Sequence, residues 1–477
     1  MSIQDIMRRM KRFVNREREL ERLRSLYESD QSTLAVVYGR RQIGKTALVL
    51  ESLRNRAGAI YYQAVQETPA VQLTRFVEVA ESVYPGIADV QREWEPLLRY
   101  LIDEDAIVVI DEFPYLIETD ASLPSIIQRL WDHEVAESQT TLVLTGSAIG
   151  MVREHVLDGG APLYGRVSQT PNGRIELKPL PFRSLREFVP AYSNEELVFV
   201  AGIFGGTPRY LAPLDDSCSL GENITRLLLD ADGSLHDEPE TVLQMELTEV
   251  NRFFSLLESM ASGNRTRNEI SQGAGIDSRD TSYYFDRLES LALIERHHPV
   301  TADPARTKTT RYRIRDPLFR FYFRYLYGRT GQYELYGEDA YADLIEPELP
   351  AFVSDTFERL CAEAVPTLYG DLQFTRVPGQ WWHKNREIDV VAPTSGSTLL
   401  VGEAKFTNSP VGYDVLAGLE DDAPHIDWTP SGGGDRAYEY ALFSRSGFKR
   451  SVEEAAESRD DLRLFELDDV VDALAPT

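Results

Sequence analysis

A short glycine-rich segment of the sequence carries the residue types that hold phosphate groups. Residues 39–46 read GRRQIGKT, directly after the apolar run TLAVVY and before the helix-forming stretch ALVLESL. Glycines let the backbone turn its N–H groups toward phosphate oxygens, and the start of the following helix favours negative charge. In such loops the lysine neutralises phosphate charge and the threonine hydroxyl ligates Mg²⁺. The pattern therefore predicts that ATP and Mg²⁺ bind here, with contacts from Gly39, Arg40, Arg41, Gln42, Ile43, Gly44, Lys45 and Thr46.

Two acidic residues end a second apolar run, AIVVIDE at 106–112. Four consecutive apolar residues are typical of a strand buried on both faces, and ligands bind at the C-terminal ends of such strands. We expect Asp111 to hold Mg²⁺ and Glu112 to polarise the attacking water. Ser147, at the end of the next apolar run, is expected to contact the nucleotide phosphate or, alternatively, to cap a helix. Arg166, in PLYGR, is expected to be a catalytic arginine finger or, alternatively, a solvated or ion-paired residue.

A third group of charged residues lies near the C-terminus. Glu358 belongs to the helical pattern AFVSDTFERLCAEAV, Asp389 to the strand pattern REIDVVAP, and Glu403 and Lys405 to TLLVGEAKF. Residues two apart on a strand project from the same face, so Glu403 and Lys405 should point the same way. Oxygen ligands from Glu358, Asp389 and Glu403 suit Mg²⁺, and Lys405 is suited to orient a water and to stabilise phosphate charge. The alternative interpretation is a surface patch of acids without catalysis.

The surrounding sequence indicates which elements must position these residues. Residues 1–170 alternate helical segments with short apolar runs, which predicts a parallel sheet with crossover helices. Residues 171–250 are mostly helical, and residues 345–477 return to an α/β pattern. A linker is expected at 331–344. The expected fold class is α/β, in at least two α/β regions with helical segments between them.

The region 251–330 differs from the rest of the chain in charge. It contains 14 Lys and Arg residues against 9 Asp and Glu residues, within a chain of net charge −27. Helical stretches at 267–272 and 278–291, separated by a turn at 273–275, form a helix–turn–helix pattern, and two β-like runs follow as a wing. The second helix would direct four residues toward a groove of DNA: Arg279, Ser282, Tyr283 and Arg287. A lid or protein-contact role is the alternative, and His297 and His298 are expected on the wing surface rather than on a metal.

Composition narrows the class of protein. The length of 477 residues allows two to four domains, and the two cysteines, far apart in sequence, exclude a disulfide framework. We expect a cytoplasmic protein, because no apolar stretch is long enough for a membrane helix and no signal peptide is visible. Seven lysines in an acidic chain favour a halophilic source, where salt screens self-repulsion. An ordinary acidic protein is the alternative, and acidity alone does not exclude nucleic acid as a partner.

These motifs resemble, in order, those of the archaeal ATPase family, a group of signal-transduction ATPases near the AAA+ ATPases. The segments are FVNRERELERL at 13–23, the loop at 39–46, VVIDEFPYL at 108–116, LTGS at 144–147, PLYGR at 162–166 and GGTPRYL at 205–211. The resemblance implies that Pro208, in Gly206-Thr207-Pro208, packs on the adenine. It also implies that Asn15-Arg16-Glu17 lies near the base, although Asn15 stands where a small residue is usual.

The C-terminal region resembles the PD-(D/E)xK nucleases and the domain of unknown function 234 found behind archaeal ATPases. Asp389 and Glu403-Ala404-Lys405 match the pattern, Glu358 matches the upstream helical acid, and Ile388 stands where a proline often precedes the aspartate. The helix–turn–helix pattern is similar to the winged helix that follows the ATPase core in the same family.

Together these resemblances imply a definite organisation. The regions are a P-loop ATPase core at 1–170, a helical lid at 171–250, a winged helix-turn-helix at 251–330, a linker at 331–344 and a restriction-endonuclease-like domain at 345–477. The expected function is an ATP-hydrolysing switch coupled to a metal-dependent, DNA-acting site. The alternative is a non-catalytic regulator, controlled by nucleotide, that binds DNA or protein. A homo-oligomer, in which Arg166 would act in trans, is a further expectation.

Overall fold

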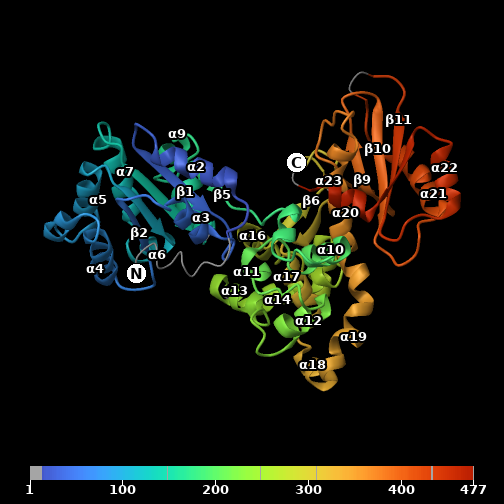
Figure 1. The fold of residues 1–477 in the computed structure, drawn as a ribbon, viewed down its shortest axis with the longest axis horizontal. Coiled ribbons are helices and arrows are strands. Elements are labelled where there is room, and N and C mark those ends of the chain that lie inside the picture. The colour runs from blue at the N-terminus through green and yellow to red at the C-terminus, as the bar shows by residue number, and fades with distance from the viewer. Residues whose placement is uncertain (1–12, 148, 248, 308, 431–432, 476–477) are drawn as a thin grey trace. The chain divides into compact units, whose positions relative to one another are not determined.

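The computed structural model describes residues 13–475 except 148, 248, 308 and 431–432 (Figure 1). The chain divides into two compact units. The N-terminal unit extends to Leu180 and also includes Thr207–Arg209, and the C-terminal unit contains Pro181–Gly206 and everything from Tyr210 onward. The N-terminal unit extends about ten residues beyond 170, where the ATPase core was expected to end, because a further strand at Arg174–Glu176 pairs with its sheet.

The N-terminal unit is built on a five-stranded sheet in the order β2-β3-β4-β1-β5, in which every pairing is parallel. The alternating pattern of the sequence predicted this sheet, and the prediction is confirmed. The strands are β1 (Thr33–Tyr38), β2 (Ala59–Gln63), β3 (Ile107–Asp111), β4 (Thr141–Gly146) and β5 (Arg174–Glu176). The helices are α2 (Glu17–Tyr27), α3 (Lys45–Ser52), α4 (Pro69–Glu81), α5 (Trp94–Asp103), α6 (Pro114–Thr119), α7 (Leu123–His133), α8 (Ile149–Val152) and α9 (Tyr164–Gln169).

Both faces of this sheet are covered, which is why its strands are continuously apolar. Along β1, Leu34 and Val36 belong to one buried cluster, whereas Ala35 and Val37 belong to another. The alternation follows from the two-residue repeat of a strand. Because both faces of the sheet are buried under apolar residues, the polar residues of the candidate site lie at the C-terminal ends of the strands.

The first part of the C-terminal unit is helical and includes a two-stranded antiparallel hairpin. Its residues from Leu185 to Leu349 share one hydrophobic cluster. The helices are α10 (Asn194–Ile203), α11 (Pro208–Leu211, which begins in the N-terminal unit), α12 (Leu220–Ile224), α13 (Glu238–Glu246), α14 (Val250–Ala261), α15 (Arg267–Gly273), α16 (Ser282–Ser290), α17 (Pro317–Phe321), α18 (Thr330–Tyr336) and α19 (Ala340–Leu344). The hairpin strands are β6 (Ile294–His297) and β7 (Arg311–Ile314).

Two features of this region differ from the expectation. Helix α16 begins at Ser282 rather than at 278, because the Asp277 carboxylate accepts a hydrogen bond from the Arg279 backbone N–H at 3.0 Å and holds a turn there. The segment 331–344 is not an extended linker but carries α18 and α19. Its helices are anchored because Tyr333 and Ala340 are buried in the shared cluster.

The last part of the C-terminal unit contains a second five-stranded sheet, in the order β12-β11-β10-β9-β8. Strands β8, β9 and β10 pair antiparallel, and β10, β11 and β12 pair parallel. The strands are β8 (Gly379–His383), β9 (Arg386–Pro393), β10 (Thr398–Lys405), β11 (Ala437–Ser444) and β12 (Leu462–Glu466). The helices are α20 (Leu349–Leu368), α21 (Tyr413–Asp422), α22 (Arg450–Glu457) and α23 (Leu467–Ala473).

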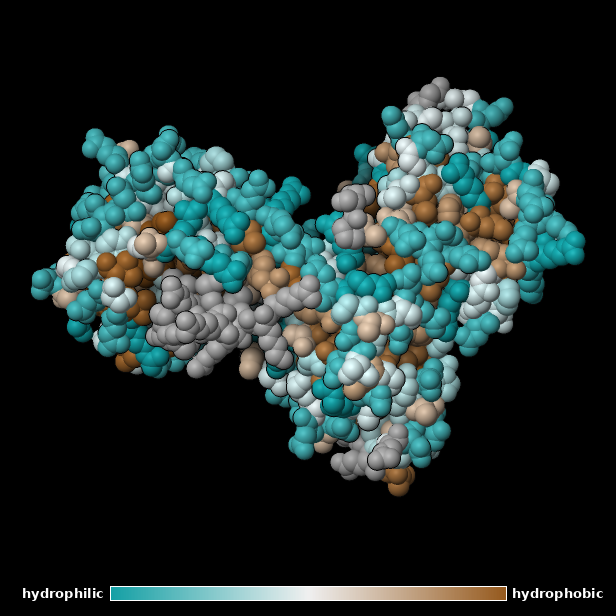
Figure 2. All heavy atoms as spheres, in the orientation of Figure 1, coloured by the Kyte–Doolittle hydropathy of each residue, from teal (hydrophilic) through white to brown (hydrophobic). Residues whose placement is uncertain are grey.

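Helices cover both faces of this second sheet (Figure 1). Phe357 of α20 and Val470 of α23 belong to the cluster on one face, and Leu416 of α21 and Val452 of α22 belong to the cluster on the other. On the molecular face drawn in Figure 2, hydrophilic residues predominate in each unit. Among the described residues, none of the helices combines the length and the apolar character that a membrane span requires.

Candidate functional site

The loop between β1 and α3 has the backbone geometry that its glycines were expected to allow. Gly39 has a φ of +154°, and a Cβ at this position would lie only 2.6 Å from the Leu177 carbonyl oxygen. Gly44, with a φ of +97°, is the residue before the first residue of α3. Both positions therefore disfavour any side chain. Lys45 is buried, and its ammonium donates to the carbonyl oxygens of Gly39 at 3.1 Å and Arg40 at 2.9 Å, so the lysine lies across the loop.

The other loop residues have distinct environments. Ile43 is buried in the cluster beneath β1, whereas Gln42 is exposed with a φ of +64°. Arg40 and Arg41 are partly exposed. The loop is thus anchored by the Ile43 side chain, while Arg40, Arg41 and Gln42 keep part of their surface exposed.

Asp111, the last residue of β3, is fully buried and accepts hydrogen bonds from three hydroxyl groups. The hydroxyls of Thr46 and Tyr61 each donate to Oδ2 at 2.7 Å, and the Thr145 hydroxyl donates to Oδ1. The Thr46 contact joins the phosphate-binding loop to the carboxylate expected to hold Mg²⁺. No motif in the sequence indicated a role for Tyr61. In the sequence, Tyr61 is visible only as a tyrosine near the C-terminal end of an apolar run. It comes within hydrogen-bonding distance of Asp111 because β2 pairs with β3.

The Tyr61 hydroxyl is a fixed proton donor. Burial, followed by the negative charge of Asp111, raises the pKa of Tyr61 far above its ordinary value. The hydroxyl therefore stays protonated at any physiological pH. It therefore always donates its hydrogen bond to the Asp111 carboxylate.

Glu112 lies just beyond β3 in a left-handed conformation, with a φ of +55°. Such a conformation is costly for a residue with a side chain and is concentrated at functional sites. The Glu112 carboxylate accepts from the Ser147 hydroxyl at 2.7 and 2.9 Å and from the Ser147 backbone N–H at 3.2 Å. The Glu112 backbone N–H donates to the Thr145 hydroxyl at 3.1 Å. Ser147, expected to contact a phosphate or cap a helix, thus holds the glutamate expected to polarise water.

The motif before α2 also contacts the core of the N-terminal unit. Arg16 is buried, with a φ of +78°, and its guanidinium donates to the Lys178 carbonyl oxygen at 2.5 Å and pairs with Glu19 at 3.3 Å. Burial lowers the pKa of Arg16 despite this pairing. The Asn15 side-chain oxygen accepts from the Arg16 N–H at 2.5 Å.

Pro208 lies beside the phosphate-binding loop. A Cβ built on Gly44 would approach the Pro208 Cγ at 3.8 Å, and Thr207 next to it is buried. The structure therefore brings the Gly-Thr-Pro element to the loop from which it is separated by more than 160 residues in sequence.

Arg166 is ion-paired, which is one of the two alternatives that the sequence left open. Its guanidinium donates to Asp132 of α7 through Nε at 2.8 Å and through Nη2 at 2.5 Å. About a quarter of its side-chain surface, 27%, is exposed. A role as an arginine finger would require this bidentate pair to open first.

In the C-terminal unit, three of the four predicted residues come together on neighbouring strands. Antiparallel pairing of Gly402 with Val390 places Glu403 of β10 beside Asp389 of β9. The Lys405 ammonium lies 2.5 Å from a Glu403 oxygen and 3.6 Å from an Asp389 oxygen. The Ala404 N–H donates to Asp389 at 3.0 Å. The two acids and the lysine therefore converge at one place on these two strands.

The electrostatics of this acidic site favour retained protons. Burial, then the charge of Asp389, raises the pKa of Glu403 to about 7. The same causes raise the pKa of Glu358, on α20, to about 9, and burial raises the pKa of Asp389. Burial opposes the charge on Lys405, but Asp389 and Glu403 raise its pKa. The site holds more carboxyl groups than positive charges, an imbalance that a cation would relieve.

Glu358 stands apart from the other two acids in its contacts. One of its oxygens accepts from the Gln380 side-chain amide at 2.7 Å. Within the residues that the structure describes, no three His, Cys, Asp or Glu side chains form a group arranged for a metal ion. The acidic site therefore consists of Asp389, Glu403 and Lys405, with Glu358 close enough to interact electrostatically.

Three of the four residues expected to contact DNA, which lie on α16 or in the turn before it, have internal partners. Arg279 pairs with Asp277 at 2.7 Å, the Ser282 hydroxyl accepts from Arg267, and Arg287 donates to the Glu246 carbonyl oxygen at 3.1 Å. Tyr283 is 62% exposed. His297, expected on the wing surface, is instead half-buried at 6.3 Å from the Trp382 ring centre, and burial lowers its pKa to about 4.

Comparison with known proteins identifies the family. Residues 13–214 match the family described as an ATPase domain predominantly from Archaea, and residues 322–415 match a family of archaeal and bacterial proteins of unknown function, domain of unknown function 234. An uncharacterized protein of Methanocaldococcus jannaschii is 33% identical over 386 residues, which cover 80% of this chain and 84% of that relative. The chain therefore belongs to the archaeal ATPase family.

Two further similarities are shorter or more distant. An uncharacterized ATP-binding protein of the same organism is 43% identical over 44 residues, covering 9% of this chain and 75% of that relative. Among solved structures, the Walker-type ATPase of Pyrococcus abyssi is 18% identical, with a TM-score of 0.48, and the match covers 65% of this chain and 96% of that one.

Proposed function

We propose that this chain binds and hydrolyses ATP at the loop 39–46, and that its nucleotide state controls a metal-dependent site that cleaves nucleic acid. The single observation that carries the ATPase part is the 2.7 Å hydrogen bond from Thr46 to Asp111. It brings together two oxygen ligands, from the phosphate-binding loop and from the end of β3, that suit Mg²⁺. When bound there, Mg²⁺ would neutralise negative charge on the β- and γ-phosphates.

The residues of the N-terminal unit have separate roles in this proposal. Lys45 exchanges its two carbonyl partners for phosphate oxygens. Glu112 turns from Ser147 to accept a proton from, or orient, the attacking water. Ser147 thus holds the glutamate in a resting position, and the stability of that position depends on the Ser147 hydroxyl and backbone N–H, which both donate to the Glu112 carboxylate. Pro208 lies close enough to Gly44 to be displaced when a nucleotide occupies the loop.

The covalent connection supplies a path for control. Thr207–Arg209 belongs to the N-terminal unit, whereas the residues on both sides belong to the C-terminal unit. A shift of Pro208 on nucleotide binding would therefore be transmitted through the backbone to the residues before Thr207 and to those after Arg209, which belong to the C-terminal unit. Such a shift would change the conformation of these adjoining segments, as in ligand-driven domain closure.

The nuclease part of the proposal is supported by the contacts of Lys405. A lysine that reaches two carboxylates on adjacent strands combines metal ligation with a positive charge for the scissile phosphate. The helix α20, the three antiparallel strands β8, β9 and β10, and the parallel strand β11 are the elements expected of a restriction-endonuclease-like domain. The elements α15, α16, β6 and β7 likewise support a winged helix.

A second candidate function has its own supporting observation. The described residues lack a third acidic ligand arranged with Asp389 and Glu403. This favours a regulator in which the C-terminal site only binds, while the nucleotide sets the conformation. The two candidates differ in whether any nucleic acid is cut.

The ATPase proposal is tested by phosphate release from ATP in the presence of Mg²⁺, with ATP-dependent thermal stabilisation measured in parallel. Glu112→Gln should keep the stabilisation and lose nearly all turnover, because an amide keeps the shape but cannot accept the proton. Lys45→Ala should lose both. Glu154→Gln, an exposed change in the same unit, is the control. Turnover in Glu112→Gln equal to that of the control would contradict the assignment.

A further inference from the structure

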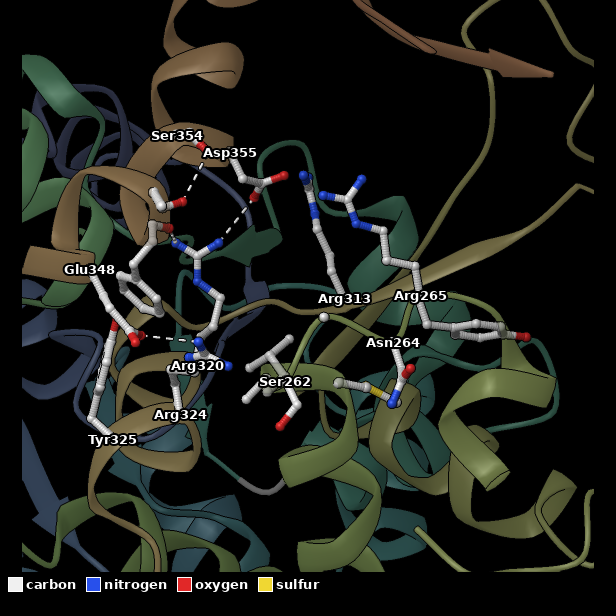
Figure 3. Close-up of a pocket in the computed structure, with 17 residues that line it drawn as sticks. Ser262, Asn264, Arg265, Arg313, Arg320, Arg324, Tyr325, Glu348, Ser354 and Asp355 are labelled. Carbon is white, nitrogen blue, oxygen red and sulfur yellow. Dashed lines mark hydrogen bonds and ion pairs between the residues drawn. The ribbon is translucent and has the colours of Figure 1, made fainter. Parts of the chain in front are cut away.

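The C-terminal unit contains two adjoining cavities lined by arginines. The larger, of about 710 Å³, is lined by α15, β7 and the β8–β9 turn, and we call it the junction groove. The smaller, of about 370 Å³, is lined by α14, β7, α17 and α20 (Figure 3). Both are lined by Gly263, Arg265 and Tyr312, so Arg265 stands where the two cavities meet.

The junction groove is strongly positive in a chain of net charge −27. Four cationic side chains line it against a single carboxylate, Glu269: they are Arg265, Arg267, Arg311 and Lys384. That carboxylate is engaged in the cap of α15, where it accepts from the Thr266 N–H at 2.8 Å, and these hydrogen bonds lower its pKa. The hydroxyl groups of Thr309 and Thr310 add further hydrogen-bonding capacity. This composition suits a chain of phosphates.

Two of these arginines are held in place before any ligand arrives. The Arg311 guanidinium lies 4.4 Å from the Trp382 ring centre and 2.8 Å from a Glu387 oxygen. Arg265 pairs with the same Glu387 oxygen at 3.0 Å. One carboxylate shared by two guanidinium groups leaves a net positive charge at fixed positions, which lowers the entropic cost of binding an anion.

The groove leads toward the acidic site. Glu387 precedes Asp389 by two residues on β9 and lies close enough that its negative charge contributes to the raised pKa of Asp389. Glu358 is also within electrostatic reach of both Arg265 and Asp389. A strand held by Arg265 is therefore held near the residues proposed to cut it.

The smaller cavity continues the positive surface. In Figure 3, the guanidinium groups of Arg265, Arg313 and Arg320 gather on the side of Asp355, and Arg320 pairs with that carboxylate at 3.2 Å. Although burial opposes ionisation of Asp355, these arginines hold its pKa far below the ordinary range. Two acids, Glu348 and Asp355, therefore face the four arginines that line this cavity.

The surface of α16 is a poorer candidate for phosphate contact. Residues 277–290 contain four acids and two arginines, and both arginines are already engaged with Asp277 and the Glu246 carbonyl. Asp286 and Glu289 lie on α16 and Asp277 and Asp280 in the turn before it, so acids outnumber arginines in this segment, whereas cations outnumber acids in the junction groove.

We propose that the phosphodiester backbone of a nucleic-acid strand binds along the junction groove, with Arg265 and Lys384 on successive phosphates, and that the groove directs this strand to Asp389 and Lys405. This inference rests on the proposed function for the fate of the strand. It assigns binding to the groove rather than to α16.

The test is the affinity of the full chain for labelled single-stranded DNA, duplex DNA and RNA of the same sequence, measured by fluorescence anisotropy in EDTA over a series of KCl concentrations. The variant is Arg265→Gln/Lys384→Gln, since Lys384 is exposed and Arg265 is 46% exposed. The matched control is Lys449→Gln/Arg450→Gln, which removes two exposed charges from the start of α22 in the same unit. Lys384→Gln alone provides a second variant that leaves the Arg265–Glu387 pair intact.

The groove variant should bind about ten-fold or more weakly than the control. Its log–log salt slope should be smaller in magnitude by about 1.4 for a single strand or about 1.8 for a duplex, because two phosphate contacts are lost. Lys384→Gln should show about half of that reduction. Equal affinity and slope in the groove variant and the control would overturn the inference, as would failure of the unmodified chain to bind any of the three nucleic acids.

The same preparations separate this inference from the proposed function. EDTA prevents cleavage, so binding is measured whether or not the acidic site is active. Groove-dependent binding without cleavage in Mg²⁺ or Mn²⁺ would support the groove and contradict the nuclease proposal. Metal-dependent cleavage that Arg265→Gln/Lys384→Gln leaves unchanged would contradict the groove and support the nuclease.

Discussion

The three hydroxyl groups around Asp111 allow a specific prediction about Tyr61. Tyr61→Phe keeps the ring, which packs in the cluster beneath β1, and removes only the 2.7 Å hydrogen bond to the carboxylate. Hydrogen bonds to charged groups contribute about 1.5–3 kcal/mol to stability. Because Asp111 keeps Thr46 and Thr145 as donors, we expect a loss of about 2 kcal/mol from the free energy of unfolding of the N-terminal unit.

The neighbouring residue supplies the matched control. The Tyr62 hydroxyl also donates within the N-terminal unit, but its acceptors are the neutral side-chain and carbonyl oxygens of Gln72. Tyr62→Phe should therefore cost only about 1 kcal/mol. The assay is denaturant unfolding, followed through the transition that ATP shifts. Equal losses in the two variants, or a loss below about 0.5 kcal/mol in Tyr61→Phe, would refute the reasoning that the hydrogen bond to the Asp111 carboxylate is the stronger of the two.

Three further predictions concern the loop, a buried histidine and the acidic site. Gly39→Ala should lose ATP-dependent stabilisation and about 2 kcal/mol of stability, since its Cβ meets the Leu177 oxygen, whereas Gly160→Ala, with open space around it, should change neither in a thermal-shift assay. His297 has a pKa lowered to about 4 by burial, so its contribution to stability is complete above pH 6.5 and is lost as the pH falls toward 4. Between pH 6.5 and 4, the free energy of unfolding of His297→Gln should therefore fall by about 2–3 kcal/mol less than that of the unmodified protein. If the two proteins lose the same free energy over this pH range, the prediction is wrong. Mn²⁺ should stabilise the full chain by relieving repulsion between Asp389 and Glu403, and Asp389→Asn should remove most of that thermal shift while Asp414→Asn, an exposed change on α21, retains it.

Local patterns were sufficient to predict the parallel sheet of the N-terminal unit and to place the candidate site residues at the ends of its strands. The glycines, Lys45 and Thr46 lie within eight residues, and the apolar runs before them and before Asp111 specify buried parallel strands. What the sequence did not reveal were the partners that depend on strand order. Tyr61 and Thr145 reach Asp111 only because β2 and β4 flank β3 in the sheet. Ser147 reaches Glu112 for the same reason.

Long-range pairing also explains the differences elsewhere. Arg166 finds Asp132 across 34 residues, and no local pattern reveals that choice. The segment 331–344 has the polar composition of a linker, yet Tyr333 and Ala340 give it enough burial to fold as helices. His297 became half-buried because Trp382, from a distant strand, lies beside it. In each case a tertiary contact outweighed the local preference.

The proposed coupling of ATP to nucleic-acid cleavage is tested most directly by one measurement. The rate of cleavage of labelled DNA and RNA by the full chain is followed in Mn²⁺, with and without ATP, for the unmodified protein, Lys45→Ala and Asp389→Asn. We predict that ATP changes the rate in the unmodified protein only, that Lys45→Ala cleaves at a rate independent of ATP, and that Asp389→Asn does not cleave. Cleavage that survives in Asp389→Asn, or an ATP effect that persists in Lys45→Ala, would contradict the account.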